Sequence, residues 1–175
     1  MGKYNIGQHG ACYEAREWYA SQPDTRTAWE TCLRGDWMLW IAAAIGVDNR
    51  KLILAKGLCA NTVRHLMKDP RSVAALDAAI AYGMGEIDKI PVDTITFAYD
   101  AYDFAYFAVA GDAAVVAAGA AYSAVAAVTA PDAPAVAAAV AAANAATNAA
   151  DRRRNEQQTA DICREILTSE VCDLF

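Results

Sequence analysis

The chain has 175 residues, 56% of them apolar, and a formal net charge of −6 from 15 basic and 21 acidic side chains. This length fits a single helical domain spanning residues 1–175, with room for a sizeable core. The acidic balance argues against non-specific nucleic-acid binding, which needs clustered Lys and Arg, and suits a basic protein partner. The chain has five cysteines, an odd number, and its first residues lack the apolar segment of a secretory signal. We therefore expect free thiols and a cytoplasmic protein.

Alanine accounts for the apolar excess, and alanine is the best helix former, so we predict an all-α fold. The predicted helices cover, in chain order, about 12–21, 25–33, 37–45, 49–67, 70–84, 94–110, 113–129 and 134–170. The predicted N-cap residues are Asp24, Asp36, Asp48, Asp69 and Asp93. The result is a compact bundle of about seven to eight helices. Because alanine side chains are small, its core depends on close helix approach and a few large anchors.

Two alanine-rich segments, 113–131 and 133–150, contain no charged residue and are long enough by count to span a bilayer. Both lack Leu, Ile and Phe, which drive membrane insertion. We therefore predict a central helical hairpin buried in protein, with a membrane hairpin as the alternative. Self-association through these alanine-rich helices, giving a homo-oligomer, is a further option.

Sequence motifs for enzymatic chemistry are missing. The chain has no nucleophile elbow, no phosphate-binding loop and no dinucleotide fingerprint. His9 and Cys12 form a possible metal pair, but no CxxC motif or second ligand pair for zinc accompanies them. We therefore predict a protein that is not an enzyme, with no catalytic residue, no cofactor and no metal site.

The segment 99–107 alternates aromatic and acidic residues. Tyr99, Tyr102 and Tyr106 follow a spacing of three and four, which places them on one face of a helix, and Asp100 and Asp103 lie on a neighbouring face. Such a surface could hold a cationic group or a basic protein loop. Alternatively, the tyrosines pack with their hydroxyls toward solvent and the aspartates form a solvated edge. We predict these five residues as the partner-binding surface.

Three of the four tryptophans fall within residues 29–40, where two short predicted helices meet. The cluster is either a site, in which tryptophan rings and an arginine hold a nucleotide-like ligand, or a structural anchor. An ion pair from the turn between the helices to the last helix would fix this corner. The residues of the cluster are Trp29, Arg34, Asp36, Trp37 and Trp40, with Asp161 and Arg164 as the predicted ion-pair partners.

The chain resembles a family in the pattern Trp29-x-x-Cys32-x-Arg34-x-Asp36-Trp37-Met-Leu-Trp40, in its alanine- and tyrosine-rich middle and in its closing Ala-Asp161-Ile-Cys-Arg164. The family is the alanine-rich, all-helical immunity proteins of bacterial polymorphic toxin loci, and similar proteins occur in phages and prophages. The resemblance implies a protein that neutralises a toxin, or a host defence protein, by direct binding. A small-molecule binding protein and a structural or membrane-associated helical module are the alternatives.

Overall fold

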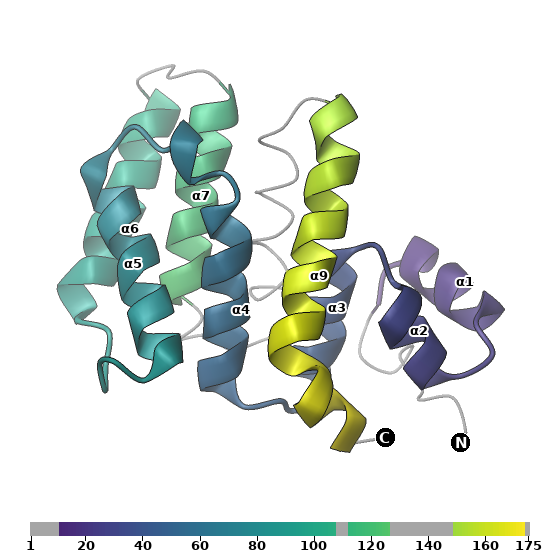
Figure 1. The fold of residues 1–175 in the computed structure, drawn as a ribbon. Helices are drawn as coiled ribbons and strands as arrows, with labels where there is room; N and C mark the ends of the chain where they lie inside the picture. The colour runs from purple at the N-terminus through teal and green to yellow at the C-terminus, as the bar shows by residue number, and fades with distance from the viewer. Residues whose placement is uncertain (1–10, 108–111, 127–148, 174–175) are drawn as a thin grey trace.

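The structure, a computed structural model, describes residues 11–107, 112–126 and 149–173, and all regular elements in these ranges are helical (Figure 1). The α-helices are α1 (Tyr13–Ser21), α2 (Thr25–Thr31), α3 (Gly35–Ala44), α4 (Asn49–Asn61), α5 (Pro70–Met84), α6 (Val92–Phe107), α7 (Asp112–Ala126) and α9 (Ala149–Asp173). A short 3-10 helix, η2 (Arg64–Leu66), follows α4. These elements confirm the predicted all-α bundle of seven to eight helices.

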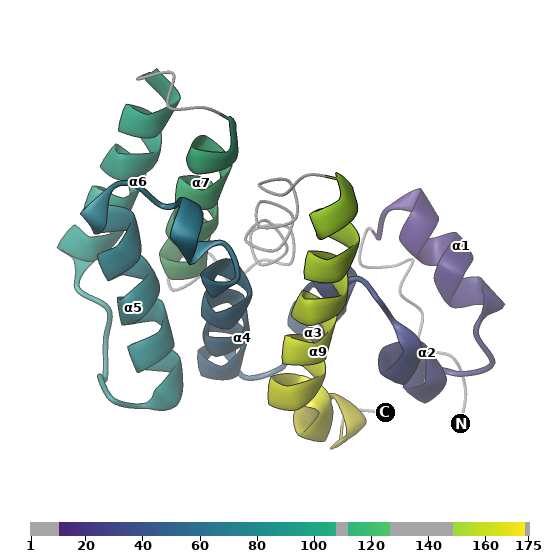
Figure 2. The ribbon, with the colours of Figure 1, turned by 45° about the horizontal axis from the view of Figure 1, so that its top comes forward.

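The helices follow one another across the molecule, and the last one returns to its middle. In both views α1 and α2 lie at one end, and α5 and α6 lie at the other (Figures 1 and 2). Helix α9 runs back between them and packs against α3 and α4. Helix α4 also packs against α5 and α7, so it joins the two halves of the bundle.

Several helix starts agree with their predicted caps. The carboxylates of Asp24, Asp48 and Asp69 accept from backbone amides in the first turns of α2, α4 and α5. The prediction for Asp36 is wrong, because α3 begins one residue earlier and Arg34 occupies the N-cap position. Asp36 instead lies in the first turn, where its negative charge is favoured by the helix dipole.

The predicted alanine-rich hairpin is described in part. Helix α7 forms its first arm, and residues 127–148, which hold most of the second arm, lie outside the described ranges. Among the helices that the structure describes, none combines the length and the apolar character that crossing a membrane requires. The buried positions on α7 are almost all alanine: Ala114, Ala117, Ala118, Ala120, Ala121, Ala124 and Val125.

Helix α4 is buried on two sides. Leu52 and Cys59 belong to a core shared with α3 and α9. Ile53 and Ala60 belong to cores shared with α5 and α7. A helix that is apolar on opposite faces lies inside a protein rather than on its surface, and this explains the central position of α4.

Glycine allows close helix approach at two crossings. A Cβ atom added at Gly83 of α5 would lie 2.7 Å from the Cα atom of Leu54 in α4. A Cβ atom added at Gly35 of α3 would lie 2.8 Å from the Cβ atom of Thr159 in α9. No side chain fits at these separations unless the helices move apart. The bundle therefore gains contact from backbone proximity, as its alanine content requires.

Candidate functional site

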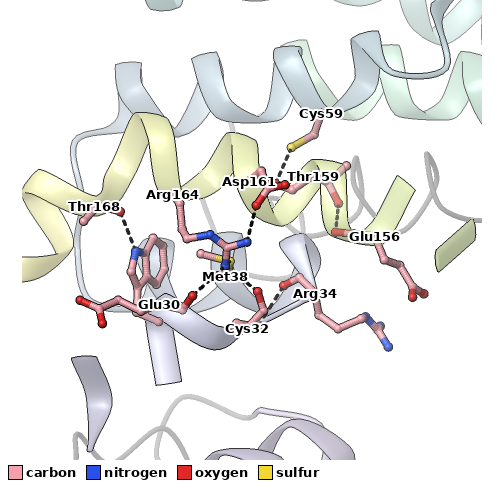
Figure 3. A network of polar contacts seen from close by, with 11 residues as sticks. Glu30, Cys32, Arg34, Met38, Cys59, Glu156, Thr159, Asp161, Arg164 and Thr168 are labelled. Carbon is pink, nitrogen blue, oxygen red and sulfur yellow. Dashed lines mark hydrogen bonds and ion pairs between the residues drawn. The ribbon is translucent and has the colours of Figure 1, made fainter. Parts of the chain in front are cut away.

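The turn between α2 and α3 is clamped by Arg164 of α9 (Figure 3). Its Nη1 atom donates to the carbonyl oxygens of Cys32 at 2.7 Å and of Glu30 at 3.4 Å. Its Nη2 atom donates to the carboxylate of Asp161 at 2.6 Å. The last carbonyl groups of a helix have no partner within it, and a cation at this end also complements the helix dipole. Arg164 therefore fixes the end of α2 on α9.

Trp29 is the second link between α2 and α9. Its side chain is only 4% exposed and belongs to the core formed with α3, α4 and α9. The indole Nε1 atom donates to the hydroxyl of Thr168 at 2.9 Å. Trp40 of α3 is half-buried. It packs against the apolar cluster formed by α1 and α2. Each tryptophan thus joins α2 or α3 to a neighbouring helix.

Arg34 and Trp37 form a contact of their own at the start of α3. The guanidinium of Arg34 makes two hydrogen bonds to Asp36, at 2.8 Å and 2.6 Å, and these bonds raise the pKa of the arginine. Its central carbon lies 4.7 Å from the centre of the Trp37 ring, a cation–π contact. The ring of Trp18 packs against the same tryptophan, at 5.7 Å between centres. These contacts join α1 to the start of α3.

The predicted ion pair between this turn and α9 does not form. Arg34 pairs with Asp36, two residues away, and Arg164 pairs with Asp161, three residues away. Each side chain pairs with a residue close to it in the sequence. Such a pair costs less chain entropy to form than a pair between distant segments. The tie between the segments exists, but it runs from a side chain to backbone carbonyl groups.

Three buried thiols lie at this junction. Cys32 is 3% exposed, and Cys59 and Cys163 are fully buried. Burial raises the pKa of Cys32 from its usual 9.0 to about 11. Contact with the Cys59 thiol, together with burial, raises the pKa of Cys163. Neutral thiols are poor nucleophiles and poor metal ligands, and within the described residues no three His, Cys, Asp or Glu side chains form a metal-binding group.

We expect the Cys32 thiol to make stability fall in alkaline solution. Its pKa is higher in the folded state than the usual 9.0, so the unfolded chain releases the proton first. Below pH 9.0 the neutral thiol contributes its full share to the free energy of unfolding. Between pH 9.0 and about 11 that free energy falls, by up to about 1.4 kcal/mol per pH unit. Urea denaturation at pH 8 and pH 10 measures this slope. Cys32→Ala, in the same experiment, should have a shallower slope; equal slopes for the two proteins would contradict the assignment.

The tyrosines of α6 turn partly toward α7. Tyr102 is half-buried, and its ring lies nearly parallel to that of Tyr122, at 6.5 Å between centres and 13° between planes. Tyr99 meets the same ring edge-on, at 5.5 Å, and keeps 46% of its surface exposed. The side chain of Tyr106 lies outside the described residues. One predicted ring therefore packs within the bundle and another remains accessible.

The aspartates of the predicted surface differ in exposure. Asp100 is exposed and Asp103 is half-buried. The charge of Asp103 and its hydrogen bond with the Tyr99 hydroxyl raise the pKa of that tyrosine. The predicted surface thus combines an exposed carboxylate, Asp100, with a half-buried one, Asp103, and its role in partner binding stays a prediction.

A second group of exposed residues on α6 shares Asp100 with the predicted surface, and its other three members were not predicted to bind a partner. Phe97 and Phe104 are 52% and 64% exposed, and Asp93 and Asp100 are exposed beside them. These four residues follow spacings of four, three and four, so they form one stripe along the helix, which we name the Asp–Phe stripe. The spacing was readable in the sequence, but exposure was not, because an apolar residue at helical spacing usually faces a core.

Comparison of the chain with known protein families, with curated proteins and with solved structures finds no match.

Proposed function

We propose that the protein is a binding protein that neutralises a toxin or a host defence protein in the cytoplasm by direct contact. The resemblance of the Trp29–Trp40 segment to immunity proteins supports this role, either as the immunity protein of a toxin locus or as a phage inhibitor of host defence. The partner is a basic protein such as a nuclease, and α6 supplies the contact surface, with Tyr99, Asp100 and Asp103 among its residues.

The observation that carries the proposal is the exposure of aromatic and acidic side chains together on α6, at one end of the bundle. Soluble proteins rarely expose large apolar side chains in groups unless a partner covers them. The sequence from Ile90 to Ala150 contains five aspartates and no Lys or Arg. A surface of one charge sign speeds docking of an oppositely charged protein and excludes others.

Co-expression with the products of neighbouring genes, followed by affinity purification, tests the proposal. We expect one of these products to co-purify, and Asp100→Lys with Asp103→Lys to weaken the complex at least about tenfold, because like charges then face each other. The matched control is Glu14→Lys with Glu17→Lys, an exposed pair of the same spacing on α1, which should leave affinity unchanged. Absence of any complex would contradict the function; equal weakening by both variants would contradict the assigned surface.

A further inference from the structure

The Asp–Phe stripe has the geometry of one side of a helix pair. Asp93, Phe97, Asp100 and Phe104 are separated by four, three and four residues, the spacing at which two helices keep facing each other along their length. All four side chains are exposed. Helix α6 packs mainly against α5 and α7, so the stripe is a face of α6 that the described helices leave exposed.

The carboxylates of the stripe are available to a basic partner. Among the described residues, no ion pair involves Asp93 or Asp100. The hydrogen bond to Asp69, and to a smaller extent the charge of Asp100, raise the pKa of Arg71, whose guanidinium pairs with Asp69 at 2.7 Å. Carboxylates that alternate with aromatic rings therefore select basic side chains alternating with apolar ones.

A hollow of about 350 Å³ opens beside the last ring of the stripe. It is lined by Lys68, Asp69, Pro70, Phe104, Ala105, Ala114 and Ala118. Three alanines on α6 and α7 make the hollow, because their short side chains leave space between the two helices and the segment before α5. This space suits one large apolar side chain, and such side chains carry most of the binding energy at protein interfaces.

The most basic exposed run of a second copy, within the described residues, does not match the stripe. This run, Arg152–Arg154, is followed on α9 by Asn155, Glu156, Gln157 and Gln158. This segment offers positive charge but no large apolar side chain at the spacing of Phe97 and Phe104. An occupant that matches the stripe supplies both kinds of side chain from one helix.

We infer that the Asp–Phe stripe binds an amphipathic helix of the partner, in which Lys or Arg and large apolar residues alternate at spacings of three and four, and that one apolar residue fills the hollow beside Phe104. This inference rests on the proposed function, since it specifies which segment of the partner is bound. The binding mode is a helix laid along a helix, read by apolar anchors and flanking charges.

The test uses a labelled synthetic peptide of about 20 residues, long enough to form a helix, with Leu and Lys alternating at spacings of three and four. A second peptide of the same composition alternates Leu and Lys at every residue, which destroys the helical stripe. We expect the first peptide to bind the full chain at least about tenfold more tightly in fluorescence anisotropy at low salt. Equal binding of the two peptides, or no binding, would overturn the inference.

Variants locate the bound peptide. Phe97→Ser with Phe104→Ser should weaken binding at least about tenfold. Tyr13→Ser with Leu33→Ser, which removes two side chains of similar exposure at the other end of the bundle, should have no effect. Loss of binding in both variants would overturn the assignment to α6. Self-association of the chain that disappears only in the Phe97/Phe104 variant would also overturn the inference, because it would assign the stripe to a second copy.

Failure of the helix-binding inference can be distinguished from failure of the proposed function. If a neighbouring gene product forms a complex that the Phe97/Phe104 variant retains, the function stands and the helix-binding inference fails. If the helical peptide binds to the stripe but no neighbouring product forms a complex, the stripe is a helix-binding surface and the toxin or defence role fails.

Discussion

Replacement of Trp29 by alanine should lower the free energy of unfolding by about 3–5 kcal/mol, the range for removing a buried aromatic ring. The ring is 4% exposed and lies in the core between α3, α4 and α9. The change also leaves the Thr168 hydroxyl without its indole donor. Urea denaturation followed by circular dichroism gives the value directly.

Two controls separate the contributions of the ring. Trp29→Phe keeps most of the apolar surface but removes the hydrogen bond to Thr168, and should cost about 1–2 kcal/mol. Leu33→Ala, at the position directly after Cys32, the C-cap residue of α2, removes a side chain that is 60% exposed and should change stability by less than about 0.5 kcal/mol. An unchanged unfolding midpoint for Trp29→Ala would show that the ring is not an anchor.

Replacement of Gly35 by alanine should lower the free energy of unfolding by about 1–3 kcal/mol, through overpacking. The added Cβ atom would lie 2.8 Å from both the Cβ atom and the carbonyl carbon of Thr159. Thr159 is fully buried, and a backbone atom cannot rotate away, so α3 and α9 must separate. Thermal and urea unfolding of the variant measure the loss.

Gly119→Ala is the matched control for the glycine effect. Its added Cβ atom would meet only the edge of the Tyr102 ring, at 3.3 Å and 3.4 Å. Alanine is favoured over glycine inside a helix by about 0.5–1 kcal/mol, so this variant should be as stable as the parent or slightly more so. If Gly35→Ala proved equally stable, the close crossing of α3 and α9 would be disproved.

The helix boundaries were predictable where one side chain or one backbone angle sets them. Asp24 and Asp48 cap their helices as predicted, and Gly85 ends α5 in the left-handed conformation that glycine adopts most easily. The error at Asp36 has a physical cause. A carboxylate is favoured both at the cap and within the first turn of a helix, so its presence does not decide the first residue.

The contacts of the tryptophan segment were less predictable than its location. Spacing located the cluster and left open whether it is a site or a structural anchor. The bonds of Arg164 end on carbonyl oxygens of Glu30 and Cys32, and every residue carries such an oxygen. No sequence pattern marks which one is chosen. The same limit applies at Gly35, because its fit against Thr159 joins positions that only the folded chain brings together.

The α6 surface shows the other limit of sequence reasoning. Helical spacing placed Tyr99 and Tyr102 on one face, and both rings contact Tyr122, but spacing could not say that this face turns toward α7. It also could not say that Phe97 and Phe104, two of the most apolar residues of the helix, remain exposed. Which side of a helix meets its neighbours depends on the packing of the whole bundle.

The bonds from α2 to α9 have a consequence for synthesis on the ribosome. Arg164 and Thr168 lie 132 and 139 residues beyond their partners Cys32 and Trp29. At typical elongation rates, these partners are made about 7–28 seconds apart. Helix α2 is therefore synthesised long before α9, the helix that covers it. The contact between α2 and α9 is among the last parts of the native bundle to form.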